Sequence, residues 1–207
     1  MGRRSRSTAQ WRQRQRSDPY LERAAREGWR SRAVFKLEQI QSRAGLLRAG
    51  MTCVDLGASP GGWSQFAARI VGPAGRVWAL DREPMDPIEG VTFVRGDFTD
   101  PQGLAALRAA LGQTRIDLVM SDMAPNISGH RVVDQPRAMH LAEAALAFAS
   151  EVLDEGGGLL VKVFQGEGFE EFVAAARRRF ETARVMKPRA SRPESREMYV
   201  LARTYGM

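Results

Sequence analysis

The chain has 207 residues, of which 43% are hydrophobic and 27% charged, and its formal net charge at pH 7 is +7. This length allows one hydrophobic core of ordinary size, so we expect one domain with an extension and not two domains. The sequence lacks a run of about 18 apolar residues and an apolar signal segment at its N-terminus, which argues against a membrane span and against export. We therefore expect a soluble, cytoplasmic monomer.

A single cysteine, Cys53, excludes an internal disulfide and a metal cluster held by several thiolates. Such sparse cysteine usage fits a reducing compartment. We expect Cys53 to be a small buried strand residue, and we expect no metal site.

The excess positive charge lies near the N-terminus. Residues 1–32 contain ten arginines against three acidic residues, whereas the rest of the chain carries 21 basic and 21 acidic residues. Residues 1–16 have no acidic residue and few apolar anchors, so we expect a disordered basic arm before a domain spanning residues 17–207. Arginine suits phosphate and Trp11 can stack on a base, which favours an RNA-binding arm. The alternatives are a solubilising tail and a mitochondrial presequence.

After the arm, the hydrophobic periodicity alternates between helical and strand patterns, which predicts an α/β fold. Helices are predicted over residues 31–44, with Ser31 as a candidate N-cap, and over residues 63–71, 102–111, 136–153 and 169–180. Strands are predicted over residues 52–56, 76–80, 91–95, 116–121, 158–163, 184–187 and 198–202. Residues 188–197 are too few for a helical crossover. We therefore expect a seven-stranded, mostly parallel sheet with one antiparallel strand at its C-terminal end.

A glycine-rich loop follows the first predicted strand. Residues 54–63 read Val-Asp-Leu-Gly-Ala-Ser-Pro-Gly-Gly-Trp and lead into the next predicted helix. Glycines let backbone amides approach a ligand at the carboxyl ends of the strands, where open α/β sheets bind cofactors. The spacing differs from the dinucleotide-binding fingerprint, and the lysine of a P-loop is missing. Because acidic residues suit a cationic ligand, we expect a sulfonium cofactor with an amino-acid tail.

An acidic residue follows each of the next three predicted strands, at Asp81, Asp97 and Asp122. In a doubly wound sheet these strand ends line one rim, and Asp55 on the first strand is expected to join them. A carboxylate at Asp81 can accept hydrogen bonds from ribose hydroxyls, and one at Asp97 from an adenine amino group. Asp122 is expected to face the methionine portion of the cofactor or the reacting centre. Each acid has an alternative role as a helix cap or turn residue.

The fifth predicted strand carries one lysine, Lys162, within the otherwise apolar run Leu-Leu-Val-Lys-Val-Phe at residues 159–164. Burial of an ammonium group is costly, so this lysine either extends to the rim of the sheet or serves chemistry, and we favour chemistry. A lysine whose pKa is lowered by desolvation and by a cationic neighbour can accept a proton near neutral pH. His130 and His140 are the rival bases, and we expect surface or packing roles for both.

Four segments carry a family resemblance. Residues 55–65 contain Asp-Leu-Gly-Ala and Pro-Gly-Gly-Trp-Ser-Gln, residues 121–126 read Ser-Asp-Met-Ala-Pro-Asn, residues 161–169 read Val-Lys-Val-Phe-Gln-Gly-Glu-Gly-Phe, and residues 195–197 read Ser-Arg-Glu. From about Ser17 to the C-terminus, the sequence resembles the FtsJ family of ribosomal RNA 2'-O-methyltransferases. The resemblance implies a Rossmann-like methyltransferase fold that binds S-adenosyl-L-methionine.

The resemblance also implies a catalytic tetrad, with Lys162 as the general base. The tetrad falls on Lys36, Asp122, Lys162 and Glu197. The implied cofactor contacts fall on Gly61, Trp63, Asp81, Asp97 and Asp122. From the residues alone, Lys36 also fits a solvated helix residue, Glu197 a partner of Arg196 or another arginine, and Trp63 a core residue.

The family's substrate is a uridine ribose in the A-loop of large-subunit, 23S-type rRNA, modified within the assembled subunit. The alternatives are the same 2'-O-methyl transfer to tRNA or to an mRNA cap, and a non-catalytic RNA-binding factor for ribosome assembly. A basic segment near the C-terminus fits either an extended RNA surface or a solvated face. It contains Arg177, Arg178, Arg179, Arg184, Lys187, Arg189 and Arg192.

Overall fold

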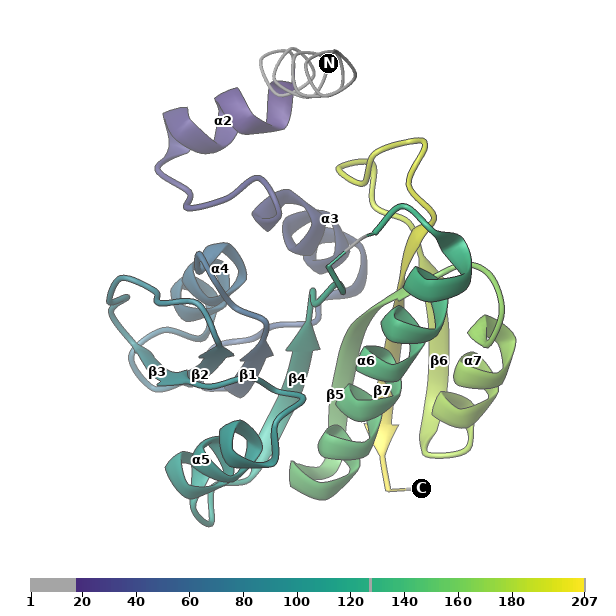
Figure 1. Ribbon diagram of the computed structural model, residues 1–207. Coiled ribbons are helices and arrows are strands. Elements are labelled where there is room, and N and C mark those ends of the chain that lie inside the picture. The colour runs from purple at the N-terminus through teal and green to yellow at the C-terminus, as the bar shows by residue number, and fades with distance from the viewer. Residues whose placement is uncertain (1–17, 127, 207) are drawn as a thin grey trace.

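The computed structural model of the chain describes residues 18–126 and 128–206. These residues form three layers, in which one twisted sheet is covered by helices on both faces (Figure 1). The predicted basic arm at residues 1–16 lies outside the described residues. Within the described ranges, no helix has the length and apolar character needed to cross a membrane.

The sheet has seven strands in the order β3-β2-β1-β4-β5-β7-β6. The strands are β1 (Thr52–Leu56), β2 (Arg76–Asp81), β3 (Val91–Arg95), β4 (Ile116–Ser121), β5 (Leu153–Phe164), β6 (Phe180–Met186) and β7 (Glu197–Tyr205). Strand β7 pairs antiparallel with both of its neighbours, while the other pairs are parallel. The predicted α/β fold, with one antiparallel strand in a mostly parallel sheet, is therefore confirmed.

Helices on the two faces bury two separate cores. The helices are α2 (Pro19–Glu27), α3 (Val34–Ala44), α4 (Gly62–Val71), α5 (Pro101–Leu111), α6 (Arg131–Val152) and α7 (Phe169–Arg177). Leu37 of α3 and Trp63 of α4 belong to the core on one face, and Phe148 of α6 and Phe172 of α7 belong to the core on the other. Cys53 of β1 is fully buried as predicted, and burial raises the pKa of its thiol to about 12.

Helix α2 was not predicted from the sequence. It begins after Asp18, whose side chain accepts a hydrogen bond from the Tyr20 amide, and Pro19 occupies the first helical position, which suits its missing N–H. Only Ala24 of this helix is buried, and the helix is polar on average, so it lacks the apolar content by which core helices are predicted. The predicted serine cap of the next helix was wrong, because Ala33 precedes α3 and no side chain caps it.

Several predicted boundaries were also wrong. Helix α6 begins at Arg131 and not at Pro136, because the Asp134 carboxylate accepts hydrogen bonds from Ser128 and the Gly129 amide and so orders the preceding turn. Strand β5 begins at Leu153 and not at Gly158, because the three glycines at 156–158 interrupt the apolar pattern from which a strand is predicted. Phe180, placed in a helix by periodicity, is the first residue of β6.

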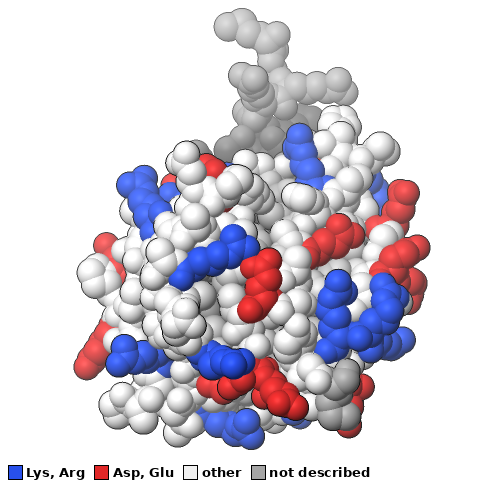
Figure 2. Space-filling model, turned by 90° about the horizontal axis from the view of Figure 1, so that it is seen from below, with Lys and Arg blue, Asp and Glu red and all other residues white. Residues whose placement is uncertain are grey.

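The basic segment near the C-terminus is divided between the two ends of the sheet. Arg177–Arg179 precede β6, whereas residues 187–192 follow its last residue, Met186, which lies in register with Tyr199 and through it with Lys162. On the face at the amino ends of the parallel strands, Lys and Arg side chains lie beside Asp and Glu (Figure 2). Arg108 pairs there with Glu151. Because Met186 is in register with Tyr199 and Lys162, residues 187–192 are the part of the basic segment at the same end of the sheet as Lys162.

Candidate active site

The glycine-rich loop between β1 and α4 forms one wall of the site. Its Gly57 and Ala58 amides donate hydrogen bonds to the Leu80 carbonyl oxygen, which ties the loop to the end of β2. Gly57 has φ of +76°, and a Cβ atom there would lie 2.4 Å from the Met123 side chain. Only glycine therefore allows this close approach of the loop to the segment after β4.

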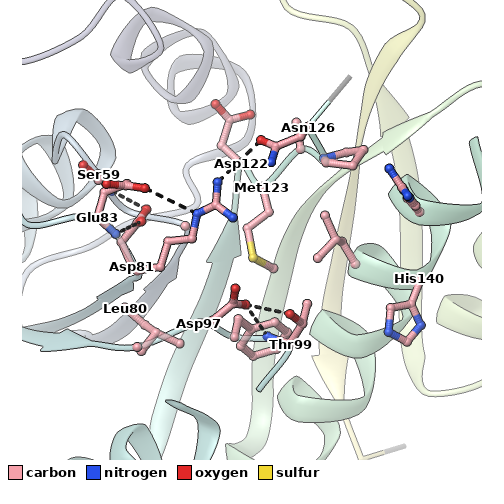
Figure 3. Close-up of a pocket in the computed structure, with 18 of the residues that line it drawn as sticks. Ser59, Leu80, Asp81, Glu83, Asp97, Thr99, Asp122, Met123, Asn126 and His140 are labelled. Carbon is pink, nitrogen blue, oxygen red and sulfur yellow. Dashed lines mark hydrogen bonds and ion pairs between the residues drawn. The ribbon is translucent and has the colours of Figure 1, made fainter. Parts of the chain in front are cut away.

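A cavity of about 740 Å³ opens beside this loop, at the carboxyl ends of β1 to β4. Its lining includes Gly57, Ser59, Leu80, Asp81, Arg82, Glu83, Gly96, Asp97, Phe98, Thr99, Asp122, Met123, Asn126, Arg137 and His140. Figure 3 shows the Met123 side chain between the wall that carries Asp81 and Asp97 and the wall that carries His140. The cavity combines apolar surfaces with several carboxylates and is large enough for a nucleoside.

Two of the predicted acids are held rigidly in this cavity. Asp81 accepts hydrogen bonds of 2.9 Å from the amides of Ser59 and Glu83, one on each carboxylate oxygen. Asp97 accepts hydrogen bonds from the Thr99 hydroxyl and amide, which lower the pKa of its carboxyl group below the usual value. Both side chains are therefore fixed as hydrogen-bond acceptors at the ends of β2 and β3.

Three of the five predicted cofactor contacts, Asp81, Asp97 and Asp122, line the cavity, and Gly61 and Trp63 are not among its lining residues. Gly61 packs under Met85 and Ile88. The Trp63 indole is 3% exposed and donates a hydrogen bond of 2.8 Å to the Ala33 carbonyl oxygen. The side chain of Trp63 therefore joins α4 to α3.

Asp55 does not lie on the rim with the other acids, contrary to the expectation from sequence. It is 1% exposed within β1, and the Ser64 hydroxyl donates a hydrogen bond of 2.6 Å to its carboxylate. Burial raises its pKa to about 7, against the opposing effect of this hydrogen bond. Asp55 is the fourth of the five residues of β1, which is paired with a strand on each side, and its side chain points into the protein and not to the strand end.

The four residues of the predicted tetrad form one cluster beside the cavity. The Nζ atom of Lys162 lies 3.1 Å from Asp122 Oδ1, and the Nζ atom of Lys36 lies 3.7 Å from Asp122 Oδ2 and 3.0 Å from Glu197 Oε1. Lys162 is 8% exposed. Two ammonium groups thus alternate with two carboxylates, so that no charge in the cluster is buried without a partner.

Three parts of the fold bring this cluster together. Lys162 and Glu197 lie at the end of β5 and the start of β7, which are paired strands, and Phe164 is the partner of Glu197 in the register. Asp122 follows the last residue of β4, which neighbours β5 on its other side. Lys36 enters from the first turn of α3, whose Leu37 and Ile40 anchor the helix in the core. The apolar positions of α3 therefore fix the direction of its lysine.

Tyr199 belongs to the same cluster and was missed in the sequence. It is fully buried, and its hydroxyl donates a hydrogen bond to Asp122 Oδ1. Burial and the charges of Asp122 and Glu197 raise the pKa of Tyr199 well above its usual value. Its position two residues after Glu197 was the available signal, because alternate residues of a strand share a face.

Asp122 is the centre of the cluster. Burial by itself raises the pKa of Asp122, but the ammonium groups of Lys162 and Lys36 and the hydrogen bond from Tyr199 lower it more strongly. The pKa of Asp122 therefore lies below its usual value. An ionised Asp122 can hold both lysines while it faces the cavity.

The remaining candidates from sequence lie apart from the cluster. His140 lies on the α6 wall of the cavity and is exposed, and His130 precedes α6 and is also exposed. Arg196 does not pair with Glu197 but donates hydrogen bonds to Gln135 and to the Gln165 carbonyl oxygen. Among the described residues, no group of three or more His, Cys, Asp or Glu side chains could hold a metal ion.

A profile of the FtsJ-like methyltransferase family matches residues 29–205, which include every member of the cluster and the cavity. The chain belongs to this family. Over the full length of both chains, this FtsJ-like methyltransferase is 53% identical to the ribosomal RNA large subunit methyltransferase E of Alkalilimnicola ehrlichii.

Solved structures agree with the methyltransferase fold. A crystal structure described as a ribosomal RNA methyltransferase from Plasmodium falciparum aligns with a TM-score of 0.77 at 24% identity, over 86% of this chain and 98% of that one. A structure described as an rRNA methylase from Clostridium thermocellum aligns with a TM-score of 0.57 at 20% identity, over 81% of this chain and 97% of that one. At such identities the likeness supports the fold alone.

Proposed function

We propose that this FtsJ-like methyltransferase transfers the methyl group of S-adenosyl-L-methionine to a ribose 2'-hydroxyl of a uridine in large-subunit, 23S-type rRNA. The observation that carries the proposal is the cluster of Lys36, Asp122, Lys162 and Glu197 at the edge of the acid-lined cavity. The relative from Alkalilimnicola ehrlichii supports the choice of large-subunit rRNA. The A-loop of the assembled subunit is the proposed target because the family resemblance implies it.

The cavity fits the proposed cofactor. Asp81 and Asp97 both line it, and we propose that Asp81 accepts hydrogen bonds from the ribose hydroxyls and Asp97 from the adenine amino group. The proposed contacts are Gly61, Trp63, Asp81, Asp97 and Asp122. Because the Trp63 indole points to α3, a contact from this residue would come from its backbone amide in the first turn of α4. When bound, the cofactor supplies the electrophilic methyl group.

Lys162 is the proposed general base. A ribose hydroxyl is a weak nucleophile, so removal of its proton during attack accelerates the reaction, typically by about 10² to 10⁴. Asp122 accepts two hydrogen bonds from the Lys162 amine, one at its carboxylate and one at its main-chain oxygen, and thereby orients the amine. Glu197 holds Lys36, which contacts the other carboxylate oxygen of Asp122 and so helps to fix the group that orients Lys162.

The RNA surface is proposed to include the exposed residues Arg189 and Arg192 in the segment after β6. This segment leads directly to Glu197 and so borders the cluster. Phosphate groups on either side of the reacting ribose could pair with these arginines. The proposed RNA-binding arm at residues 1–16 would add to the same electrostatic attraction.

Mapping the methylated nucleotide tests the proposal. Ribosomal particles that lack the modification, and in separate reactions tRNA and capped mRNA, are incubated with the protein and labelled S-adenosyl-L-methionine, and the labelled RNA is digested and sequenced. We expect one labelled ribose in large-subunit rRNA. Label in tRNA or in an mRNA cap would move the same chemistry to another substrate. Failure to bind the cofactor in calorimetry would favour a non-catalytic assembly factor.

A further inference from the structure

The end of β5 that carries Lys162 lacks a strand neighbour on one side. Strand β4 ends at Ser121, which is paired with Val161, whereas β5 continues to Phe164. The last residues of β5 are therefore paired only with β7. The backbone on the β4 side of these residues needs other partners, because a buried carbonyl oxygen without a hydrogen bond is costly.

Gln135 of α6 supplies a hydrogen-bond donor on this side of β5. Its side-chain amide donates hydrogen bonds of 3.0 Å to the Phe164 carbonyl oxygen and 2.9 Å to the Glu167 carbonyl oxygen. Gln135 is 7% exposed, and a Cβ atom on Gly166 would lie 2.9 Å from its amide carbon. The loop after β5 is thus packed directly against this one side chain.

The same amide also reaches the start of β7. Its oxygen accepts a hydrogen bond of 3.3 Å from Arg196, whose guanidinium group donates another of 2.8 Å to the Gln165 carbonyl oxygen. The Gln165 amide in turn donates to the Arg196 carbonyl oxygen, which extends the ladder between β5 and β7 by one step. Gln135 therefore joins the residue before Glu197 to the residues after Lys162.

We propose that Gln135 is a positioning residue for methyl transfer, which fixes the Lys162 amine and the Glu197 carboxylate from the opposite face of the sheet. It touches neither residue and does not line the cofactor cavity. It acts through Phe164, two residues after Lys162, and through Arg196, one residue before Glu197. This inference rests on the proposed catalytic roles of Lys162 and Glu197. We call Gln135 and Arg196, with their hydrogen bonds to the loop after β5, the clamp. A displacement of about 1 Å at a reacting group can slow an enzyme by about a hundredfold, so loss of the clamp is expected to lower the rate of methyl transfer.

Two variants of equal side-chain length test the clamp. Gln135→Met removes all three hydrogen bonds, and Gln135→Glu keeps the acceptor for Arg196 but loses both donors. Thermal unfolding of both variants shows which of them is folded under the assay conditions. In both we expect the methyl-transfer rate at saturating RNA and cofactor to fall at least about tenfold. The dissociation constant of S-adenosyl-L-methionine should stay within about twofold, and Gln113→Met, an exposed control at the opposite end of the sheet, should match the wild type.

A double-mutant cycle separates positioning from simple stabilisation. If Gln135 and Arg196 form one clamp, Gln135→Met and Arg196→Met together should slow transfer by less than the product of their separate effects. Rates within threefold of the wild type for folded Gln135 variants would overturn the inference. The inference would also be overturned if the variants changed only the KM for RNA, or if their loss of activity matched the fraction of unfolded protein. If the wild type transfers methyl groups and Lys162→Ala does not, any of these three results refutes the clamp and leaves the proposed function standing. A wild type without transfer would refute both proposals.

Discussion

The Lys162 amine lies 3.1 Å from Asp122 Oδ1, and the main-chain oxygen of Asp122 accepts a second hydrogen bond from it. One residue thus holds the amine at two points, while the Tyr199 hydroxyl fixes the carboxylate itself. The Nζ atom is therefore directed by Asp122, which follows β4, and through it by Tyr199 of β7, as well as by its own strand. This arrangement predicts which substitutions affect the chemistry and which affect only binding.

Lys162→Ala should lower methyl transfer by at least about a hundredfold, which is the lower bound for the loss of a general base. Lys162→Arg is the matched variant, because it keeps a cation for Asp122 but a guanidinium group does not accept a proton. Both variants should bind S-adenosyl-L-methionine in calorimetry. Activity within about threefold of the wild type in either variant would rule out Lys162 as the base.

Glu197→Gln should have a smaller effect than either Lys162 variant. Glu197 contacts the cluster through Lys36, and its loss removes one charged hydrogen bond worth about 1.5 kcal/mol, or roughly tenfold in rate. Single-turnover rates measured for the two substitutions under the same conditions test this order. A Glu197→Gln enzyme as slow as Lys162→Ala would mean that Glu197 acts directly on the substrate.

Asp81→Asn should weaken cofactor binding and leave the fold intact. The neutral amide loses the charge-assisted hydrogen bonds that a carboxylate offers to ribose hydroxyls, so the dissociation constant should rise at least about tenfold. Asp86→Asn is the control, since Asp86 is exposed and not among the residues that line the cavity. Equal affinities of the two variants in calorimetry would place the ribose elsewhere.

Asp55→Asn should gain stability relative to the wild type as pH rises from about 4 to about 7. Because burial raises the pKa of Asp55 from 3.8 to about 7, the folded protein keeps this proton at pH values where the unfolded chain has lost it. The resulting stabilisation is complete below about pH 4 and is lost as pH rises through about 7. Between these values the wild type should lose about 1.4 kcal/mol per pH unit relative to the variant. Denaturant unfolding at pH 5, 6, 7 and 8 measures the difference. A difference that does not change with pH would contradict the raised pKa.

Much of the fold could be predicted because buried strands have short apolar runs with glycine or acidic residues at their ends. The same reasoning predicted Asp81, Asp97 and Asp122 at the cavity, since the ends of parallel strands share one edge. It failed for Asp55, because the position of a residue within the strand, and not its charge, decides whether its side chain reaches the edge of the sheet. Lys36 and Glu197 could be joined to Lys162 only through the family resemblance, since no local pattern shows that α3 faces β7.

Gln135 could not be predicted at all. Its importance depends on β4 ending before β5, a difference in strand length that periodicity does not resolve, and on the true start of α6. Tyr199 could have been predicted from the sequence, because it lies on the same strand face as Glu197. Residues that act through backbone carbonyl groups leave no such pattern.

The position of β7 between β5 and β6 has a consequence for biosynthesis. Glu197 and Tyr199 follow Lys36, Asp122 and Lys162 in the chain, so they are translated after them. A nascent or prematurely terminated polypeptide that ends before β7 has both amines but lacks Glu197 and the tyrosine hydroxyl that holds Asp122. Such a polypeptide lacks the complete cluster, and we expect it to be inactive in methyl transfer.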